Sequence, residues 1–165
     1  MLLCPGTDRS IELAISTRGR YGVRALLAIV KADGPLSTAH ISKLEDISLP
    51  YLEQIFNKLK RAGVVSAKRG AQGGYILARA PEKISVGEVI AILDGPVKFS
   101  QCHHPEHEEE CEKKDICASR RFWSDLENDV NSKLYKTSLQ DLKNIETGLI
   151  EQVQAHDSEA NLLRS

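Results

Sequence analysis

The stretch of the chain that is richest in chemically active side chains is CHHPEHEEECEKKDIC, at residues 102–117. It contains three of the four cysteines, spaced C-x8-C-x5-C at Cys102, Cys111 and Cys117. Histidines and acids fill the positions between them, so this stretch cannot be a core element. Thiolates bind soft metal centres, and the free energy of metal binding can replace a missing apolar core. We therefore expect the three cysteines to be metal ligands.

Three cysteines leave one ligand position for another donor. Iron–sulfur clusters commonly take four cysteines, and histidine replaces cysteine in some of them, which makes His104 and His107 candidates. Zinc is the main alternative metal, because three cysteines and one histidine form a known structural zinc site. A disulfide switch between Cys111 and Cys117 is a second alternative. An acidic loop with unbound thiols is the third.

Charge is distributed unevenly between the two halves of the chain. Residues 1–80 contain 12 Lys and Arg against 6 Asp and Glu, a net charge of +6, whereas residues 81–165 contain 10 against 17, a net charge of −7. A basic half joined to an acidic half predicts that the first half meets a polyanion. No apolar run approaches the roughly 18 residues of a membrane span. The sparse cysteines and the lack of a signal-peptide pattern indicate a cytoplasmic protein with no membrane partner.

Apolar periodicity in the first half predicts helices and one hairpin. Ser37, Ser48 and Ser85 are suited to cap helices, Pro50 is tolerated in a first turn, and Gly63 suits a left-handed helix end. The period then changes to that of strands in residues 64–78, around a glycine-rich turn. This order of three short helices, a hairpin and a fourth helix predicts a winged helix-turn-helix, within a fold that is mainly α with a small β-hairpin.

After the cysteines the helical pattern resumes. Trp123, Leu126, Val130 and Leu134 form an apolar stripe, and Ser138 is suited to cap a further helix. An amphipathic helix of this length needs a partner, so we expect an isologous homodimer. Such a dimer places two reading helices one DNA turn apart, about 34 Å, on a pseudo-palindromic operator. The expected organisation is an N-terminal extension (1–15), a winged helix-turn-helix domain (16–95), a cysteine-rich cluster-binding loop (96–118), dimerisation helices (119–154) and a flexible tail (155–165).

The third predicted helix supplies the candidate base-reading residues. Its polar side contains Tyr51, Glu53 and Gln54 near its start, where a recognition helix meets base edges. Gln54 can bond adenine through two hydrogen bonds, and Glu53 can accept from the amino group of cytosine. Lys58 and Arg61 are suited to contact phosphates.

The hairpin tip supplies a candidate for the minor groove. Arg69 is the natural probe, because a narrow minor groove attracts cations. The neighbouring Gln72 and Gly73 belong to a glycine-rich turn that lets backbone approach DNA closely. Arg18 and Arg20, at the start of the first helix, are expected to hold phosphate beside that helix N-terminus.

Several of these segments resemble a known family, the Rrf-two superfamily of bacterial transcription regulators. Within it the chain resembles the IscR-type iron–sulfur cluster regulators, because the three cysteines are specific to cluster-binding members. The resemblance covers about residues 15 to 145. The matching stretches are STRGRY (16–21), ISLPYLEQIF (47–56), RGAQGGY (69–75), VGEVI (86–90) and, after the cysteines, FWSDL (122–126).

The resemblance implies a homodimer with a [2Fe-2S] cluster in each subunit, whose presence changes which promoters are bound. It also implies that Tyr51, Glu53 and Gln54 belong to the base-reading helix and that Arg69 is the minor-groove residue. The chain departs from relatives at two positions. Arg120 stands where IscR-type relatives place a histidine ligand, and Arg20 stands where nitric-oxide-sensing relatives use an aspartate.

These observations predict a DNA-binding transcription regulator that responds to an iron–sulfur cluster. The alternative is a regulator of the same fold controlled by zinc, by thiol oxidation or by a partner enzyme, as in cysteine-metabolism relatives. An enzyme is not expected, because the sequence has no nucleophile elbow, phosphate loop or oriented Cys–His pair.

Overall fold

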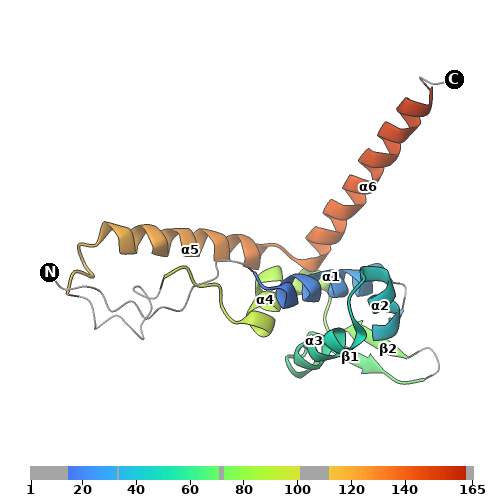
Figure 1. Ribbon diagram of the computed structural model, residues 1–165, viewed down its shortest axis with the longest axis horizontal. Helices are drawn as coiled ribbons and strands as arrows, with labels where there is room; N and C mark the ends of the chain where they lie inside the picture. The colour runs from blue at the N-terminus through green and yellow to red at the C-terminus, as the bar shows by residue number, and fades with distance from the viewer. Residues whose placement is uncertain (1–14, 33, 71–72, 101–111, 163–165) are drawn as a thin grey trace.

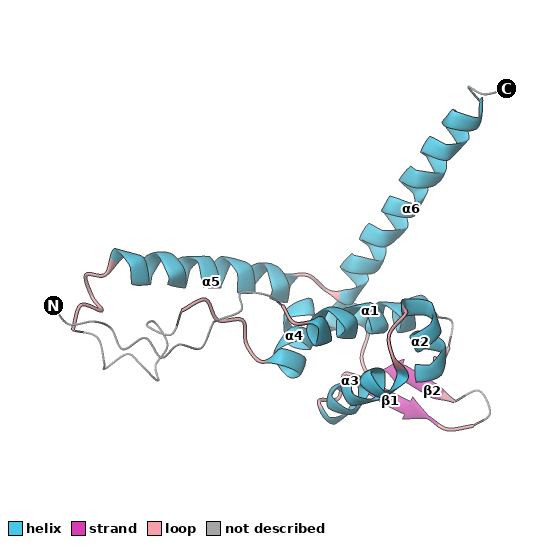
Figure 2. Ribbon diagram, in the orientation of Figure 1, coloured by secondary structure: helices cyan, strands magenta, loops and turns pink. Residues whose placement is uncertain are grey.

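The computed structural model describes residues 15–32, 34–70, 73–100 and 112–162. This part of the chain consists of helices and one two-stranded antiparallel sheet (Figure 2). The predicted fold class, mainly α with a small hairpin, is therefore confirmed. The elements in chain order are α1 (Thr17–Lys31), α2 (Thr38–Glu45), α3 (Leu49–Arg61), β1 (Val65–Lys68), β2 (Gly74–Leu77), the 3₁₀ turn η1 (Pro81–Lys83), α4 (Val86–Asp94), α5 (Ala118–Lys136) and α6 (Leu139–Leu162).

Local sequence signals set most of the helix ends. The Ser37 hydroxyl accepts the His40 N–H, and the Ser85 hydroxyl accepts the Glu88 N–H, as expected for N-caps. Gly63 takes a φ of 71° just after α3, where only glycine is unstrained. The caps at Ser37 and Ser85 and the stop after α3 are thus confirmed, whereas Ser48 occupies the N-cap position of α3 without a capping hydrogen bond to its side chain.

The core of the winged helix is centred on α3. Leu52, Ile55, Phe56 and Leu59 are fully buried on one side of that helix. The Phe56 ring lies 4.6 Å from the ring of Tyr75, centroid to centroid, which joins α3 to β2. Because the whole apolar side of α3 is buried, its opposite side is held facing solvent. Other members of the core are Ala25, Leu26, Ile29, Ile41, Ile47, Val64, Val65, Ile84, Val89, Leu93 and Leu139.

The hairpin is tied to the segment before α2. β1 and β2 pair antiparallel, from Val65 opposite Leu77 to Lys68 opposite Gly74. On the other edge of β2, Leu36 and Tyr75 exchange two backbone hydrogen bonds of 3.0 and 2.9 Å. A Cβ at Gly74 would lie 2.5 Å from the carbonyl carbon of Leu36, so glycine is required for this approach. The wing is therefore fixed relative to α2.

The two long helices extend away from the winged helix in different directions (Figure 1). They meet at an elbow at residues 137–138. The Val86 N–H donates to the Thr137 carbonyl and the Leu139 N–H donates to the Ile84 carbonyl, each at 2.9 Å. The first part of α6 packs on α1, where Lys31 forms an ion pair with Glu146 at 2.9 Å. The rest of α6 continues outward to Leu162, beyond the end predicted at residue 154.

Some predicted features lie outside the described residues. They are Cys102, His104, His107, Cys111 and Gln72, most of the N-terminal extension, and the last three residues of the tail. In the part that the structure describes, no helix combines the length and the apolar character needed to cross a membrane.

Candidate DNA-binding surface and cysteine loop

The exposed side of α3 carries most of the predicted base-reading residues. Glu53 and Gln54 lie in its first turns and are exposed, and Arg61 is exposed at its other end. They lie opposite the buried side of the helix, so packing within the domain orients them outward. At the start of an exposed helix, a carboxylate can accept hydrogen bonds from base edges, and an amide can both donate and accept them.

Tyr51, in contrast, is partly buried. Its ring packs edge-on against the ring of Tyr21 of α1, with centroids 6.1 Å apart. The Arg24 guanidinium lies 5.4 Å from the centre of that Tyr21 ring. This aromatic contact holds the first turn of α3 against α1, so Tyr51 has a packing role in addition to the base-reading role predicted for it.

The wing presents Arg69 as an exposed cation at its tip. Gly70 has a φ of 126°, and its carbonyl accepts the Gly73 N–H at 2.9 Å. A Cβ at Gly73 would lie 2.7 Å from the Lys68 carbonyl oxygen, so the backbone of Gly73 lies close to that of Lys68. Such a turn brings backbone and one cation close to any surface that it touches, as the wing prediction requires.

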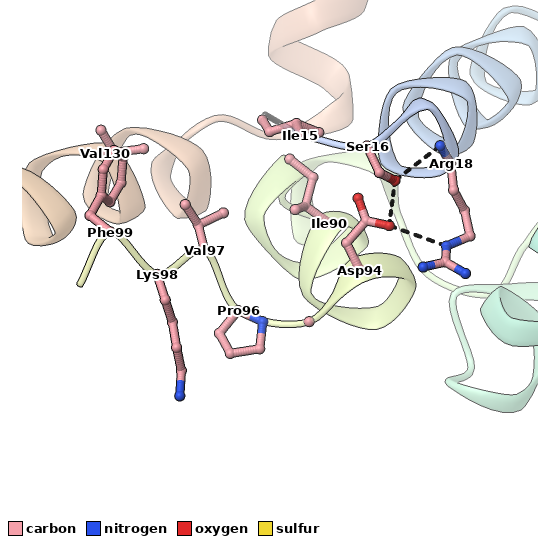
Figure 3. Close-up of a pocket in the computed structure, with 11 residues that line it drawn as sticks. Ile15, Ser16, Arg18, Ile90, Asp94, Pro96, Val97, Lys98, Phe99 and Val130 are labelled. Carbon is pink, nitrogen blue, oxygen red and sulfur yellow. Dashed lines mark hydrogen bonds and ion pairs between the residues drawn. The ribbon is translucent and has the colours of Figure 1, made fainter. Parts of the chain in front are cut away.

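The two arginines at the start of α1 have partners within the chain. The Arg18 Nε–H donates to Asp94 Oδ1 at 3.1 Å, and the Ser16 hydroxyl donates to the same oxygen at 2.6 Å (Figure 3). Arg20 is exposed, and its Nη2 donates to the Thr17 hydroxyl at 3.4 Å. Arg18 therefore joins α1 to the end of α4, whereas Arg20 remains on the surface.

Lys58 also has a partner within the chain. Its Nζ donates to the backbone carbonyl of Leu93, in the last turn of α4, at 3.0 Å. The last carbonyls of a helix lack partners within it and carry partial negative charge, so an ammonium is favoured there. The residue predicted as a phosphate ligand thus contacts α4.

Cys117 is the one predicted metal ligand that falls in the described part of the chain. Its thiol is free and half-buried, and its Sγ accepts the Arg120 N–H at 3.4 Å as the N-cap of α5. A helix N-terminus favours negative charge on sulfur, which suits a thiolate ligand. A pocket of about 490 Å³, lined partly by Arg121 and Asp125, opens beside it. Within the described residues no three metal-binding side chains gather.

A short segment, residues 95–100, connects α4 to the cysteine loop, and we call it the strap. The Phe99 N–H donates to Glu127 Oε2 of α5 at 2.8 Å, and Asn131 donates to the Val97 carbonyl at 3.4 Å. Figure 3 shows the strap between α4 and Val130 of α5, along a pocket of about 450 Å³. Both flanks of the cysteine loop are therefore held by α5, one at Glu127 and the other at Cys117.

Two residues of this arrangement did not emerge as site candidates from sequence reasoning. Neither Asp94 nor Glu127 is among the predicted site residues. Glu127 does carry a signal, because it lies four residues after Trp123 and three before Val130, on the apolar stripe. A charged residue at such a position is unusual, and here it is buried, with 8% exposed. Asp94 has no comparable local signal.

The sequence of most of the chain matches a known protein family. Residues 15–145 match the Rrf2 family, which is described as an iron-dependent transcriptional regulator. The chain belongs to the Rrf2 family. The resemblance inferred from the YLEQ helix, the GGY wing and the cysteines is thereby confirmed.

Curated Rrf2 relatives carry the name HTH-type transcriptional regulator IscR. The relative from Aliivibrio salmonicida is 39% identical over 132 residues, which cover 79% of this chain and 77% of the relative. The relative from Yersinia enterocolitica is 37% identical over 134 residues, covering 80% of each chain.

Solved structures of Rrf2-like regulators share the fold. CymR of B. subtilis, titled the global cysteine regulator, superimposes with a TM-score of 0.69 at 34% identity, covering 80% of this chain and 97% of CymR. T. potens IscR superimposes with a TM-score of 0.66 at 33% identity, covering 84% and 91%. The chain is thus a transcription regulator of the winged-helix type.

Proposed function

We propose that this Rrf2 regulator is a cytoplasmic homodimer whose binding to operator DNA responds to a [2Fe-2S] cluster. Cys102, Cys111 and Cys117 are the proposed ligands. The observation that carries the proposal is the position of Cys117, a free thiol at the N-terminus of α5 whose sulfur accepts a backbone N–H. The IscR name of the curated relatives compared above favours a cluster over control by zinc, thiol oxidation or a partner enzyme.

The residues around Cys117 fit a thiolate-ligated cluster. The Cys117 sulfur accepts a backbone N–H at the N-terminus of α5, and the strap and Cys117 fix the two flanks of the loop on one helix. Arg120 has no acceptor atom and cannot be the fourth ligand. When bound, a cluster with three cysteines and one weaker donor supplies an exchangeable iron position, which suits a sensor. His104 and His107 are the proposed donors within the loop.

The apolar residues of the long helices support a homodimer. Phe122 is 59% exposed on α5, and Leu149 is 56% exposed on α6. Each helix thus carries several exposed large apolar residues, and exposed apolar groups of this kind mark interaction sites. A second copy of the chain presents the same surface, as an isologous interface requires. Other large apolar residues exposed on these helices are Trp123, Tyr135, Ile145, Ile150 and Val153.

The test of the cluster is metal analysis. Protein purified without oxygen is expected to be coloured, to contain iron and acid-labile sulfide in equal amounts, and to lose its visible absorption when Cys117 is replaced by Ala. Its affinity for a duplex selected from a random library is expected to change when the cluster is removed. A colourless protein that contains zinc, or equal affinity with and without the cluster, would refute the proposal.

The wing provides a separate test of the DNA surface. If Arg69 lies in the minor groove, Arg69→Ala weakens binding and lowers the slope of log affinity against log salt by about 0.9. Affinity measured between 50 and 200 mM salt, the range over which about 10³-fold changes are typical, checks this prediction. Unchanged affinity would show that Arg69 does not contact DNA. Lys83→Ala, a change of an exposed cation outside the wing, is the control.

A further inference from the structure

Lys58 is an exposed residue of the helix that faces DNA, yet its ammonium group bonds to another helix of the domain. The Nζ donates to the Leu93 carbonyl at 3.0 Å, in a partly buried position. Glu53 and Gln54 of the same helix are exposed at its other end. Lys58 therefore joins the recognition helix α3 to the C-terminal turn of α4, 35 residues away in sequence.

The C-terminal turn of α4 is a junction between three parts of the molecule. Beside Leu93, the Asp94 carboxylate accepts from Ser16 and Arg18 at the start of α1 (Figure 3). A Cβ at Gly19 would lie 2.5 Å from Asp94 Oδ2, so the carboxylate is seated directly on α1. Helices α1, α3 and α4 thus meet at this turn.

The strap leaves this junction directly. Gly95 turns the chain with a φ of 92°, and four residues later Phe99 is held by Glu127 at 2.8 Å. Phe99 precedes the first cysteine, Cys102, by three residues. The strap is thus a short segment, anchored twice on α5, between the cysteine loop and the carbonyl that Lys58 binds.

We propose that Lys58 is a positioning residue, which ties the recognition helix to the segment leading into the cysteine loop, and that it is not a phosphate ligand. This inference rests on the proposed cluster response and assigns the route by which that response reaches α3. Loss of the tether by substitution of Lys58 removes one positive charge from α3, as substitution of Lys60 does, and in addition uncouples the orientation of α3 from the strap. Allosteric couplings between sites typically change affinity about 5- to 150-fold. The tether is proposed to maintain a ratio of this size between the DNA affinities with and without the cluster.

The test uses full-length Lys58→Met, with Lys60→Met as the matched control, because Lys60 is an exposed lysine on the same helix. Affinity for a duplex selected from a random library by the cluster-loaded wild type is measured without oxygen, with and without the cluster, across a range of salt. Lys58→Met is expected to keep the wild-type salt slope and to reduce the ratio of the two affinities about fivefold or more. Lys60→Met is expected to keep that ratio.

Two results would overturn the inference. A slope lower by about 0.9 in Lys58→Met identifies a phosphate contact. If Lys58→Met keeps the wild-type ratio of the affinities with and without the cluster, the bond from Lys58 to Leu93 does not carry the cluster response. If the wild type itself binds equally in both states, the proposed function fails, and the slope alone still decides whether Lys58 meets phosphate. Lys58→Gln, which removes the charge but keeps an amide donor, supplies the same slope measurement if the methionine variant does not fold.

Discussion

The winged helix and the pair of long helices differ in how they dispose of apolar side chains. In the winged helix, the apolar sides of α1, α3 and α4 are buried against one another and against the hairpin. Among the described residues of α5 and α6, Glu127 and Leu139 are the buried ones, and large apolar side chains remain exposed along both helices. The winged helix buries its apolar side chains within its own core, whereas α5 and α6 require another surface to bury theirs.

The largest expected effect comes from opening the self-contained core. Phe56→Ala removes a fully buried ring that joins α3 to β2. Such substitutions cost about 3–5 kcal/mol of unfolding free energy, a large fraction of the stability of a domain. Denaturant unfolding at fixed protein concentration measures it. Leu44→Ala, at a leucine that is 60% exposed in the same domain, is the control and is expected to change stability by less than about 0.5 kcal/mol.

The next effect concerns assembly through the long helices. Leu149→Asp places a carboxylate on the exposed apolar side of α6, where burial in an interface is strongly unfavourable. The dimer dissociation constant is expected to rise about tenfold or more, a change of about 1.4 kcal/mol, while the winged helix stays folded. Sedimentation velocity measures it. Asn144→Asp adds the same charge on the opposite side of α6 and is expected to leave the dimer intact; equal dissociation by both variants would argue against this interface.

The strap links the two regions, and its anchor gives an intermediate effect. Glu127→Ala leaves the Phe99 N–H without the carboxylate that accepts it at 2.8 Å. An unpaired buried donor costs about 1–3 kcal/mol, so unfolding free energy falls by that amount. Glu127→Gln retains an acceptor oxygen and is expected to lose less than half as much. Equal losses from Ala and Gln would show that the hydrogen bond is unimportant.

The smallest effect is local, at the start of α6. Ser138 and Asp141 cap this helix reciprocally: the Ser138 N–H donates to the carboxylate at 2.9 Å, and the Asp141 N–H donates to the Ser138 hydroxyl at 3.1 Å. Ser138→Ala is expected to cost about 1 kcal/mol, measured by thermal unfolding. Substitution to Thr, which can also cap, is the control.

The same cap carries a pH dependence. Hydrogen bonds from the Ser138 backbone N–H and hydroxyl lower the pKa of Asp141. A carboxylate with a lowered pKa stabilises the folded state above its unfolded pKa, and this stabilisation is lost as the pH falls through the folded pKa. The difference in melting temperature between wild type and Ser138→Ala is therefore expected to narrow on acidification. A constant difference would show that the Ser138 hydroxyl does not stabilise the Asp141 carboxylate.

Features set by neighbours in sequence could be predicted, and features set by distant pairs could not. The caps at Ser37 and Ser85 and the helix end at Gly63 follow from one to three adjacent residues. The fold and the exposed positions of Glu53 and Gln54 follow from apolar periodicity. The partners of Lys58 and Glu127 lie 35 and 28 residues away, and no local pattern encodes such pairs. The prediction that Lys58 contacts phosphate rests on its charge and its place on the polar side of α3, which do not reveal its bond to Leu93.

The elbow at residues 137–138 has a consequence for the geometry of the operator. Backbone hydrogen bonds fix the elbow to the winged helix. The direction of α5 and its rotation about its own axis are therefore fixed relative to the winged helix. In a twofold dimer whose interface is formed by α5, one residue inserted into α5 would rotate the partner by about 100° and shift it by about 1.5 Å. The two recognition helices would then face different sides of the duplex. Insertion of seven residues, close to two turns, would restore the facing but lengthen the spacing by about 10 Å, selecting operators with a longer centre.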